Sequence, residues 1–157
     1  MNILILSVGT RNKIVQYFKS ELDGKGLVIA TDASELAPAL YDADKHYIVP
    51  RIDDADYLDI IKKICVENNV KGILSLIDPE LSILAKHKQE FIDIGVTPII
   101  SDLKSIELCF NKFLFSEKLS ELGFNTIRSY INKDLNSIAY KEMIKYLSNI
   151  VLWKYKD

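Results

Sequence analysis

The sequence predicts an α/β protein in which a parallel sheet lies between two layers of helices, and two observations support this fold class. Four short runs in the first half of the chain are almost continuously apolar: 2–6, 27–30, 47–49 and 73–77. Strands that are covered on both faces have this composition, whereas half-exposed strands alternate. The segments between the runs carry apolar residues at helical spacing, as the crossover connections of parallel strands do.

The first half of the predicted sheet alternates strands with helices. The first strand leads into a helix over 11–22, which ends at the glycine-containing turn 23–26, because glycine adopts the left-handed conformation that closes helices. A second strand over 27–31 follows. A helical turn over 39–44 then leads to a third strand at 46–49.

The second half continues this alternation. A helix over 54–69 precedes the fourth strand at 72–77. A proline in the first turn favours a helix over 79–93, with Ile92 facing inward. A fifth strand spans 96–100.

Two further helices follow the fifth strand. Ser101 or Asp102 caps one of them, and the other runs over 111–122 and ends at Gly123. Right-handed crossovers between parallel strands give a Rossmann-like, doubly wound, three-layer α/β/α arrangement. We assign residues 1–123 to this domain.

Residues 124–157 have a different pattern. The stretch 125–131 is typical of a strand, and 134–151 carries the apolar stripe of an amphipathic helix. We interpret 124–157 as the truncated or atypical start of a second region.

Composition excludes several classes of function. The 157 residues carry a formal net charge of −2, so the chain has no broad basic field for nucleic acid. No apolar run is long enough to span a bilayer, and the N-terminus shows no export signal. The two cysteines and two histidines are not spaced as metal ligands. We therefore expect a cytoplasmic protein that binds neither nucleic acid nor membrane and holds no metal site.

Polar residues follow three of the predicted strands, at the edge where open parallel sheets bind their ligands. Gly9 and Arg11 come after the first strand, and Asp32 comes after the second. Asp78 and Glu80 come after the fourth. Because the carboxyl ends of parallel strands share one edge, we expect Arg11, Asp32 and Asp78 to lie along the same rim of the fold.

Each of these residues has two interpretations. Gly9 and Arg11, with the amides that start the next helix, suit a carboxylate or phosphate, or else they are a turn glycine and an arginine in solvent. Asp32 either accepts ligand hydroxyls or an ammonium group, or it caps a helix. Asp78 either binds a cation or an amino group, or it caps the following helix. For Glu80 the simpler role beside the helix dipole is favoured.

The sequence does not indicate a catalytic centre. His87 lies between two lysines on a helix face expected to be solvated, and no serine, cysteine or histidine forms a nucleophile constellation. The fingerprint G-x-G-x-x-G is absent, since Gly9 is the only glycine before Gly24. A nicotinamide-dependent oxidoreductase is therefore the weakest of the functions considered.

Seven short segments occur in an order that is typical of a known family: 3–11, 30–32, 37–44, 47–50, 76–81, 111–113 and 122–124. Together they resemble the N-terminal (pre-ATP-grasp) domain of ATP-grasp ligases, and most of all the carbamoyl-phosphate-synthase large-subunit-like group that includes the pyrrolysine-pathway ligase. The resemblance covers about residues 1–128.

The resemblance implies an ATP-dependent ligation, in which a carboxylate is activated as an acyl phosphate and is then attacked by an amine. The first domain of the family contributes strand-end groups to the pocket of a small carboxylate or amine substrate. The matching groups here are Gly9, Thr10, Arg11, Asp32, Asp78 and Glu80. The resemblance also implies that Lys112 reaches the phosphates of ATP, although the residue before it is Asn111 where the family usually has Asp.

The family's catalytic elements do not follow in this sequence. Members continue through a lysine-bearing strand that grips ATP, a flexible glycine-rich loop and acidic Mg²⁺ ligands, none of which is found after Tyr130. Phosphoryl transfer needs such a clamp. We therefore expect no catalytic residue here and no tight binding of ATP or Mg²⁺. The chain is interpreted as the substrate-side part of a ligase: either it is a truncated product that lacks its ATP-grasp half, or it is a stand-alone fragment that works with a partner subunit.

Two alternatives stay open. In the first, the chain is a stand-alone module that binds an amino acid or a nucleotide at the same edge of the sheet. The second concerns assembly: the helix predicted over 134–151 either covers an apolar face of the domain or forms a homodimer.

Overall fold

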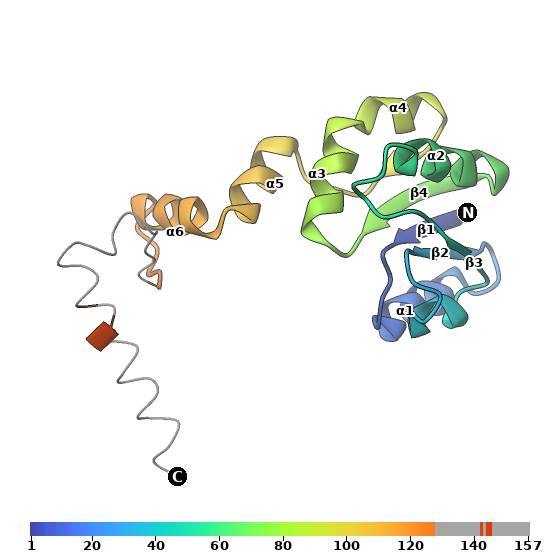
Figure 1. Cartoon of the computed structure of the whole chain (residues 1–157), viewed down its shortest axis with the longest axis horizontal. Helices are drawn as coiled ribbons and strands as arrows, with labels where there is room; N and C mark the ends of the chain where they lie inside the picture. Colours follow the sequence, from blue (N-terminus) through green and yellow to red (C-terminus); the bar gives the residue numbers. More distant parts are fainter. Residues whose placement is uncertain (128–141, 143, 146–157) are drawn as a thin grey trace, which may run out of the picture. The chain divides into compact units, whose positions relative to one another are not determined.

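Five strands form one sheet in the residues that this computed structural model describes, which are 1–127, 142, 144 and 145 (Figure 1). The strands are β1 (Asn2–Leu6), β2 (Val28–Asp32), β3 (Lys45–Ile48), β4 (Val70–Ser75) and β5 (Thr97–Pro98). Their order is β3-β2-β1-β4-β5, and every neighbouring pair is parallel. From β1 the chain adds β2 and then β3 on one side, and it then adds β4 and β5 on the other side of β1. The predicted Rossmann-like, doubly wound fold is confirmed.

Helices connect the strands and cover both faces of the sheet: α1 (Asn12–Leu22), the 3₁₀ helix η1 (Pro38–Asp42), α2 (Tyr57–Glu67), α3 (Asp78–Lys86) and α4 (Lys88–Asp93). The helices α5 (Leu103–Phe110) and α6 (Lys112–Glu121) follow β5 in the chain. In Figure 1, α1 and α2 lie on opposite sides of the strands. This is the arrangement that right-handed crossovers on the two sides of β1 require.

Two buried clusters hold the helices against the sheet. On one face, Leu4 and Leu6 of β1 belong to the same cluster as Ile61 of α2, Leu84 of α3 and Phe91 of α4. The other face is covered by α1 and η1. Its buried residues include Ile3, Ile5, Val15, Val28, Ala30, Ala39 and Leu40. The central strands are buried on both faces, which explains their almost continuous apolar sequence.

The predicted helix over 79–93 is wrong in one respect, because the chain forms two helices that meet at His87. His87 ends α3 and caps α4, with φ −104° and ψ 18°, outside the helical region. This break turns the helical face, so Phe91 is fully buried and Ile92, which we expected to point inward, is 44% exposed. A continuous period of 3.6 residues cannot describe a helix interrupted in this way.

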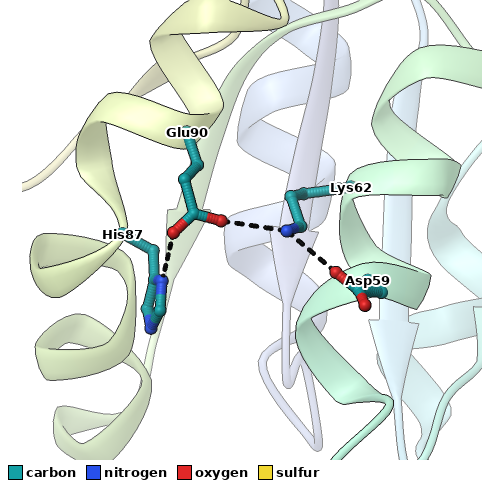
Figure 2. A network of polar contacts seen from close by, with 4 residues as sticks. All are labelled: Asp59, Lys62, His87 and Glu90. Atoms are coloured by element: carbon teal, nitrogen blue, oxygen red, sulfur yellow. Dashed lines mark hydrogen bonds and ion pairs between the residues drawn. The ribbon is translucent and has the colours of Figure 1, made fainter.

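A charged network connects α4 to α2 (Figure 2). Lys62 Nζ lies 2.8 Å from Asp59 Oδ1 and 2.9 Å from Glu90 Oε2, while the other oxygen of Glu90 lies 2.6 Å from His87 Nδ1. The hydrogen bonds with Asp59 and Glu90 raise the pKa of Lys62, and those from His87 and Lys62 lower the pKa of Glu90. The network thus fixes the first turn of α4, next to the break at His87, against α2.

Strand β5 is shorter than predicted, with two residues in place of five. Proline has no N–H to donate to the ladder, and Pro98 pairs with Ile73 of β4. The pairing continues one step further, since Ile99 N donates to Ile73 O at 2.8 Å. Beyond that point the chain leaves the sheet.

The chain divides into two compact units, Met1–Glu107 and Leu108–Asp157. The second unit contains α6, which Asn111 caps by accepting a hydrogen bond from Leu114 N at 3.2 Å. The domain boundary placed after residue 123 stays a prediction. Residues 125–127 are not in a strand, while the rest of the strand predicted over 125–131 and most of the helix predicted over 134–151 lie outside the described residues.

No helix in the described part of the chain has both the length and the apolar character that crossing a membrane requires.

Candidate functional site

The topology brings three strand ends together at one edge of the sheet. β2 and β4 flank β1 and run parallel to it, with Ile5 paired to both Ala30 and Leu74. The segments 7–11, 33–34 and 76–80 therefore follow their strands at the same edge. The strand order reverses between β1 and β4, and such a switch point is where open parallel sheets bind ligands. Arg11 and Asp78 follow strands at this edge, and Asp32 is the last residue of β2.

The segment between β1 and α1 has an unusual backbone. Ser7 and Gly9 both have left-handed conformations, with φ +45° and +51°, and Val8 between them is fully buried. Val8 N donates to Thr31 O at 3.1 Å, and Arg11 N donates back to Val8 O at 2.9 Å. Glycine adopts such a φ without strain, so Gly9 is explained by the turn itself. Ser7 has no such freedom.

Asp32 binds the backbone of this segment. Its Oδ2 accepts a hydrogen bond from Gly9 N at 2.8 Å, and its Oδ1 accepts one from Ser34 N at 2.9 Å. The amide of Gly9 is therefore already bonded to a carboxylate of the protein. Both oxygens of Asp32 stabilise loops that follow neighbouring strands.

Glu80 is buried, with 1% of its surface exposed. Its Oε1 accepts hydrogen bonds from Ser7 Oγ and from the Tyr57 hydroxyl, each at 2.6 Å, and its Oε2 accepts one from Ser75 Oγ. Glu80 lies in the first turn of α3, where the helix dipole favours a negative charge. The expected place beside the dipole is therefore found, but the carboxylate faces the protein interior.

The hydroxyl groups around Glu80 were not predicted from the sequence. Tyr57 occupies the inner face of α2, and its pKa is raised, first by burial and then by the negative charge of Glu80 and the hydrogen bond to it. Ser75 is a polar residue at the end of a buried apolar strand, and Ser7 directly follows another. A serine at or directly after the end of an apolar strand is the signal in the sequence that could have indicated this cluster.

Three of the residues predicted at this edge of the sheet keep exposed side chains: Thr10, Arg11 and Asp78. Arg11 Nη1 donates to Ser7 O at 3.3 Å, which leaves most of the guanidinium's donors for another partner. Asp78 is the first residue of α3. Its carboxylate makes no hydrogen bond or ion pair with the described residues. One edge of the sheet thus presents an unpaired carboxylate and a largely unpaired guanidinium.

Lys112 is exposed at the first position of α6, in the second unit. Among the described residues, no group of three histidine, cysteine, aspartate or glutamate side chains is arranged to hold a metal ion.

Comparison with known families identifies the class of this domain. Residues 3–99, more than half of the chain, match the family model described as the PylC-like, N-terminal domain. The chain therefore belongs to this family, which is the N-terminal, pre-ATP-grasp domain that the sequence resembles. No curated protein matches the sequence.

Several solved ATP-grasp ligases have the same fold. L-amino acid ligase from Bacillus licheniformis matches with a TM-score of 0.60 and 19% identity, over 87% of this chain and 34% of that one. N5-carboxyaminoimidazole ribonucleotide synthetase from Thermotoga maritima matches with a TM-score of 0.57 and 19% identity, over 85% of this chain and 35% of that one. The biotin carboxylase subunit of pyruvate carboxylase matches with a TM-score of 0.57 and 20% identity, over 82% and 29%. The chain thus spans about a third of the length of these structures.

Proposed function

We propose that this chain is the substrate-side domain of a cytoplasmic ATP-grasp carboxylate–amine ligase, and that it does not catalyse the reaction by itself. Membership of the PylC-like N-terminal family is the observation that carries the proposal. The exposed charges that follow β1 and β4 support a substrate role, and the described residues contain no cluster of histidine, cysteine, aspartate or glutamate that could hold a metal ion. Such a domain binds and orients one substrate, while the ATP-grasp part activates it.

Arg11 and Asp78 are the residues proposed to contact the substrate. Guanidinium groups bind carboxylates and phosphates through paired hydrogen bonds, and an exposed carboxylate suits an amine. Both side chains are exposed, and both follow strands that flank the switch point. Thr10 adds a hydroxyl beside Arg11. Gly9, Asp32 and Glu80 belong to the same proposed site, with direct contact made by the exposed side chains.

Nucleotide binding is proposed to depend on residues outside this domain. Lys112 would contribute one charge to the ATP phosphates, and the ATP-grasp half, in the same or a partner chain, would contribute the rest and the Mg²⁺ ligands. One structurally similar enzyme, N5-carboxyaminoimidazole synthetase from Staphylococcus aureus, is described in complex with ADP. For this chain alone we expect ATP binding to be too weak to measure by calorimetry.

Titration of the ¹⁵N-labelled chain with acetate, methylamine and alanine tests the proposal. We expect millimolar affinities, with shifts centred on the amides of Thr10, Arg11 and Asp78. Arg11→Ala is expected to remove the response to acetate, and Asp78→Asn the response to methylamine. Lys13→Ala and Glu21→Gln, which remove exposed charges from α1, are matched controls. Shifts elsewhere, or none, would contradict the proposal. Micromolar binding of an amino acid or nucleotide would favour the stand-alone module instead.

A further inference from the structure

The Glu80 carboxylate joins three separate elements of the domain. Ser7 follows β1, Tyr57 begins α2 and Ser75 ends β4, and each donates its hydroxyl proton to Glu80. A carboxylate that is 1% exposed is costly unless it is fully hydrogen-bonded. These three bonds and the first turn of α3 supply the compensation. A structure that only needed a packed core would not require this arrangement.

The bond to Ser7 acts on a backbone that is otherwise unfavourable. Ser7 has a φ of +45°, and the left-handed conformation reduces the population of a non-glycine residue by roughly tenfold. The side chain of Ser7 is held by Glu80 Oε1, and the next residue, Val8, is held by its own burial and by Thr31 O. The conformation at Ser7 therefore depends on the hydrogen bond that Glu80 accepts.

The carbonyl of Ser7 in turn contacts Arg11. Arg11 Nη1 donates to Ser7 O at 3.3 Å, and the direction of that carbonyl is set by the backbone angles around Ser7. Two hydrogen bonds and one residue thus connect the buried carboxylate of Glu80 with the exposed guanidinium of Arg11. Asp32 supports the same segment from its other side, through Gly9 N.

We propose that Glu80 is a positioning residue: by holding Ser7 in its left-handed conformation, it fixes the place of Arg11 at the ligand-binding edge. Glu80 itself does not touch the ligand in this arrangement. The inference rests on the proposed function for the statement that Arg11 binds an anion. The effect of Glu80 on the conformation of the segment 7–11 stands independently of that function.

Ser7→Ala and Ser7→Gly form the decisive pair of variants. Both lose the hydroxyl, but only glycine adopts a positive φ freely. In the wild type, residue 7 should show the strong intraresidue NOE between the amide and Hα protons that a positive φ produces in an L residue, and in Ser7→Gly the Arg11 Nε–Hε resonance and the acetate affinity should stay as in the wild type. In Ser7→Ala this NOE should weaken, the Arg11 Nε–Hε resonance should shift, and the dissociation constant for acetate should rise about tenfold. Equal behaviour of the alanine and glycine variants would overturn the proposal.

Tyr57→Phe is the matched control for a purely structural role. It removes the other hydroxyl bonded to the same oxygen of Glu80 at the same 2.6 Å, so it lowers the urea midpoint without acting on Ser7. We expect the resonances of 7–11 and the acetate affinity to stay as in the wild type. If Tyr57→Phe shifts them as Ser7→Ala does, Glu80 serves the core in general and the proposal fails. If the wild type does not bind acetate, the proposed function fails, while the NOE and Arg11 resonances still decide the positioning role.

Discussion

Asp32→Asn and Glu80→Gln are the same chemical change at two carboxylates, yet we expect them to differ in their effect on stability. Each replaces one carboxylate oxygen by an NH₂ group of similar size. The partners of Asp32 are two backbone amides, Gly9 N and Ser34 N, which can only donate. The partners of Glu80 are three hydroxyls, and a hydroxyl can rotate and accept a proton instead.

The magnitudes follow from this difference. In Asp32→Asn the single remaining oxygen can serve only one of the two amides, so one N–H donor faces an NH₂ donor. An unsatisfied donor costs about 1–3 kcal/mol when buried, and the half-buried position of Asp32 places the value near the lower end. In Glu80→Gln every partner can reorient, and the substitution also removes a buried charge. We expect it to change the free energy of unfolding by less than about 1 kcal/mol.

Urea unfolding followed by circular dichroism at neutral pH measures both variants against the wild type. The midpoint of Asp32→Asn should fall clearly below that of Glu80→Gln, with unchanged dependence on urea. Glu21→Gln, an amidation on the exposed side of α1, is expected to lie within about 0.5 kcal/mol of the wild type. A larger loss of stability in Glu80→Gln than in Asp32→Asn would refute the reasoning. It would mean that the fold requires the negative charge of Glu80, and not only hydrogen-bonding groups that match the three hydroxyls.

Three further predictions test the packing and the electrostatics of the domain. Phe91→Ala should lower the free energy of unfolding by about 3–5 kcal/mol and Ile92→Ala by far less, since only Phe91 is buried; equal losses in urea unfolding would contradict the break between α3 and α4. Cys109 is exposed and should react with a thiol reagent at once. Cys65 should react only on unfolding, because Cys65 is buried and burial raises the pKa of its thiol to about 12. Cys109→Ser should abolish the fast phase of the reaction, and a fast phase that remains would contradict this assignment. The pKa of Glu90 is lowered from an ordinary value of 4.5, so its stabilising effect is complete above that pH and is lost as the pH falls through the lowered value. The stability difference between wild type and Glu90→Gln should close in acid, and a difference that grows there would be inconsistent with the network in Figure 2.

The sequence predicted the strands well where burial alone determines their composition. β1 and β4 are covered on both faces, and the strands predicted at 2–6 and 72–77 agree with them within two residues at each end. At β3, on the edge of the sheet, Lys45 and His46 are exposed, and the apolar run marked only the second half of the strand. β5 was overestimated because its pairing stops near Pro98, and hydropathy does not register a missing N–H.

The sequence predicted the edge of the sheet at which the candidate site residues lie, but not the hydrogen bonds between them. That charged residues follow β1, β2 and β4 is visible in the sequence, and the parallel fold places them at one edge. Which of them face inward depends on contacts between residues far apart in the chain. Ser7 and Glu80 are 73 residues apart, and Tyr57 and Glu80 are 23 apart. A pattern with a range of a few residues cannot contain such pairs, so Glu80 looked like an ordinary charge in the first turn of a helix.

The division between inward and outward charges has a physical reason. A side chain that binds a small ligand must be held in place beforehand, because every degree of freedom that is fixed on binding reduces the affinity. The segment from Ser7 to Arg11 is short and partly left-handed, and Val8 is its one fully buried residue, so packing holds Val8 but neither Ser7 nor Arg11. Asp32 fixes Gly9 and Glu80 fixes Ser7, one from each side of β1. Two carboxylates that resemble ligand-binding groups in the sequence therefore accept hydrogen bonds from the protein itself. These hydrogen bonds hold the segment that carries Arg11 in a defined place. It follows that Asp32→Ala and Ser7→Ala should each broaden or shift the Arg11 resonances although neither removes a group exposed to the ligand, whereas Asp78→Asn should leave them unchanged.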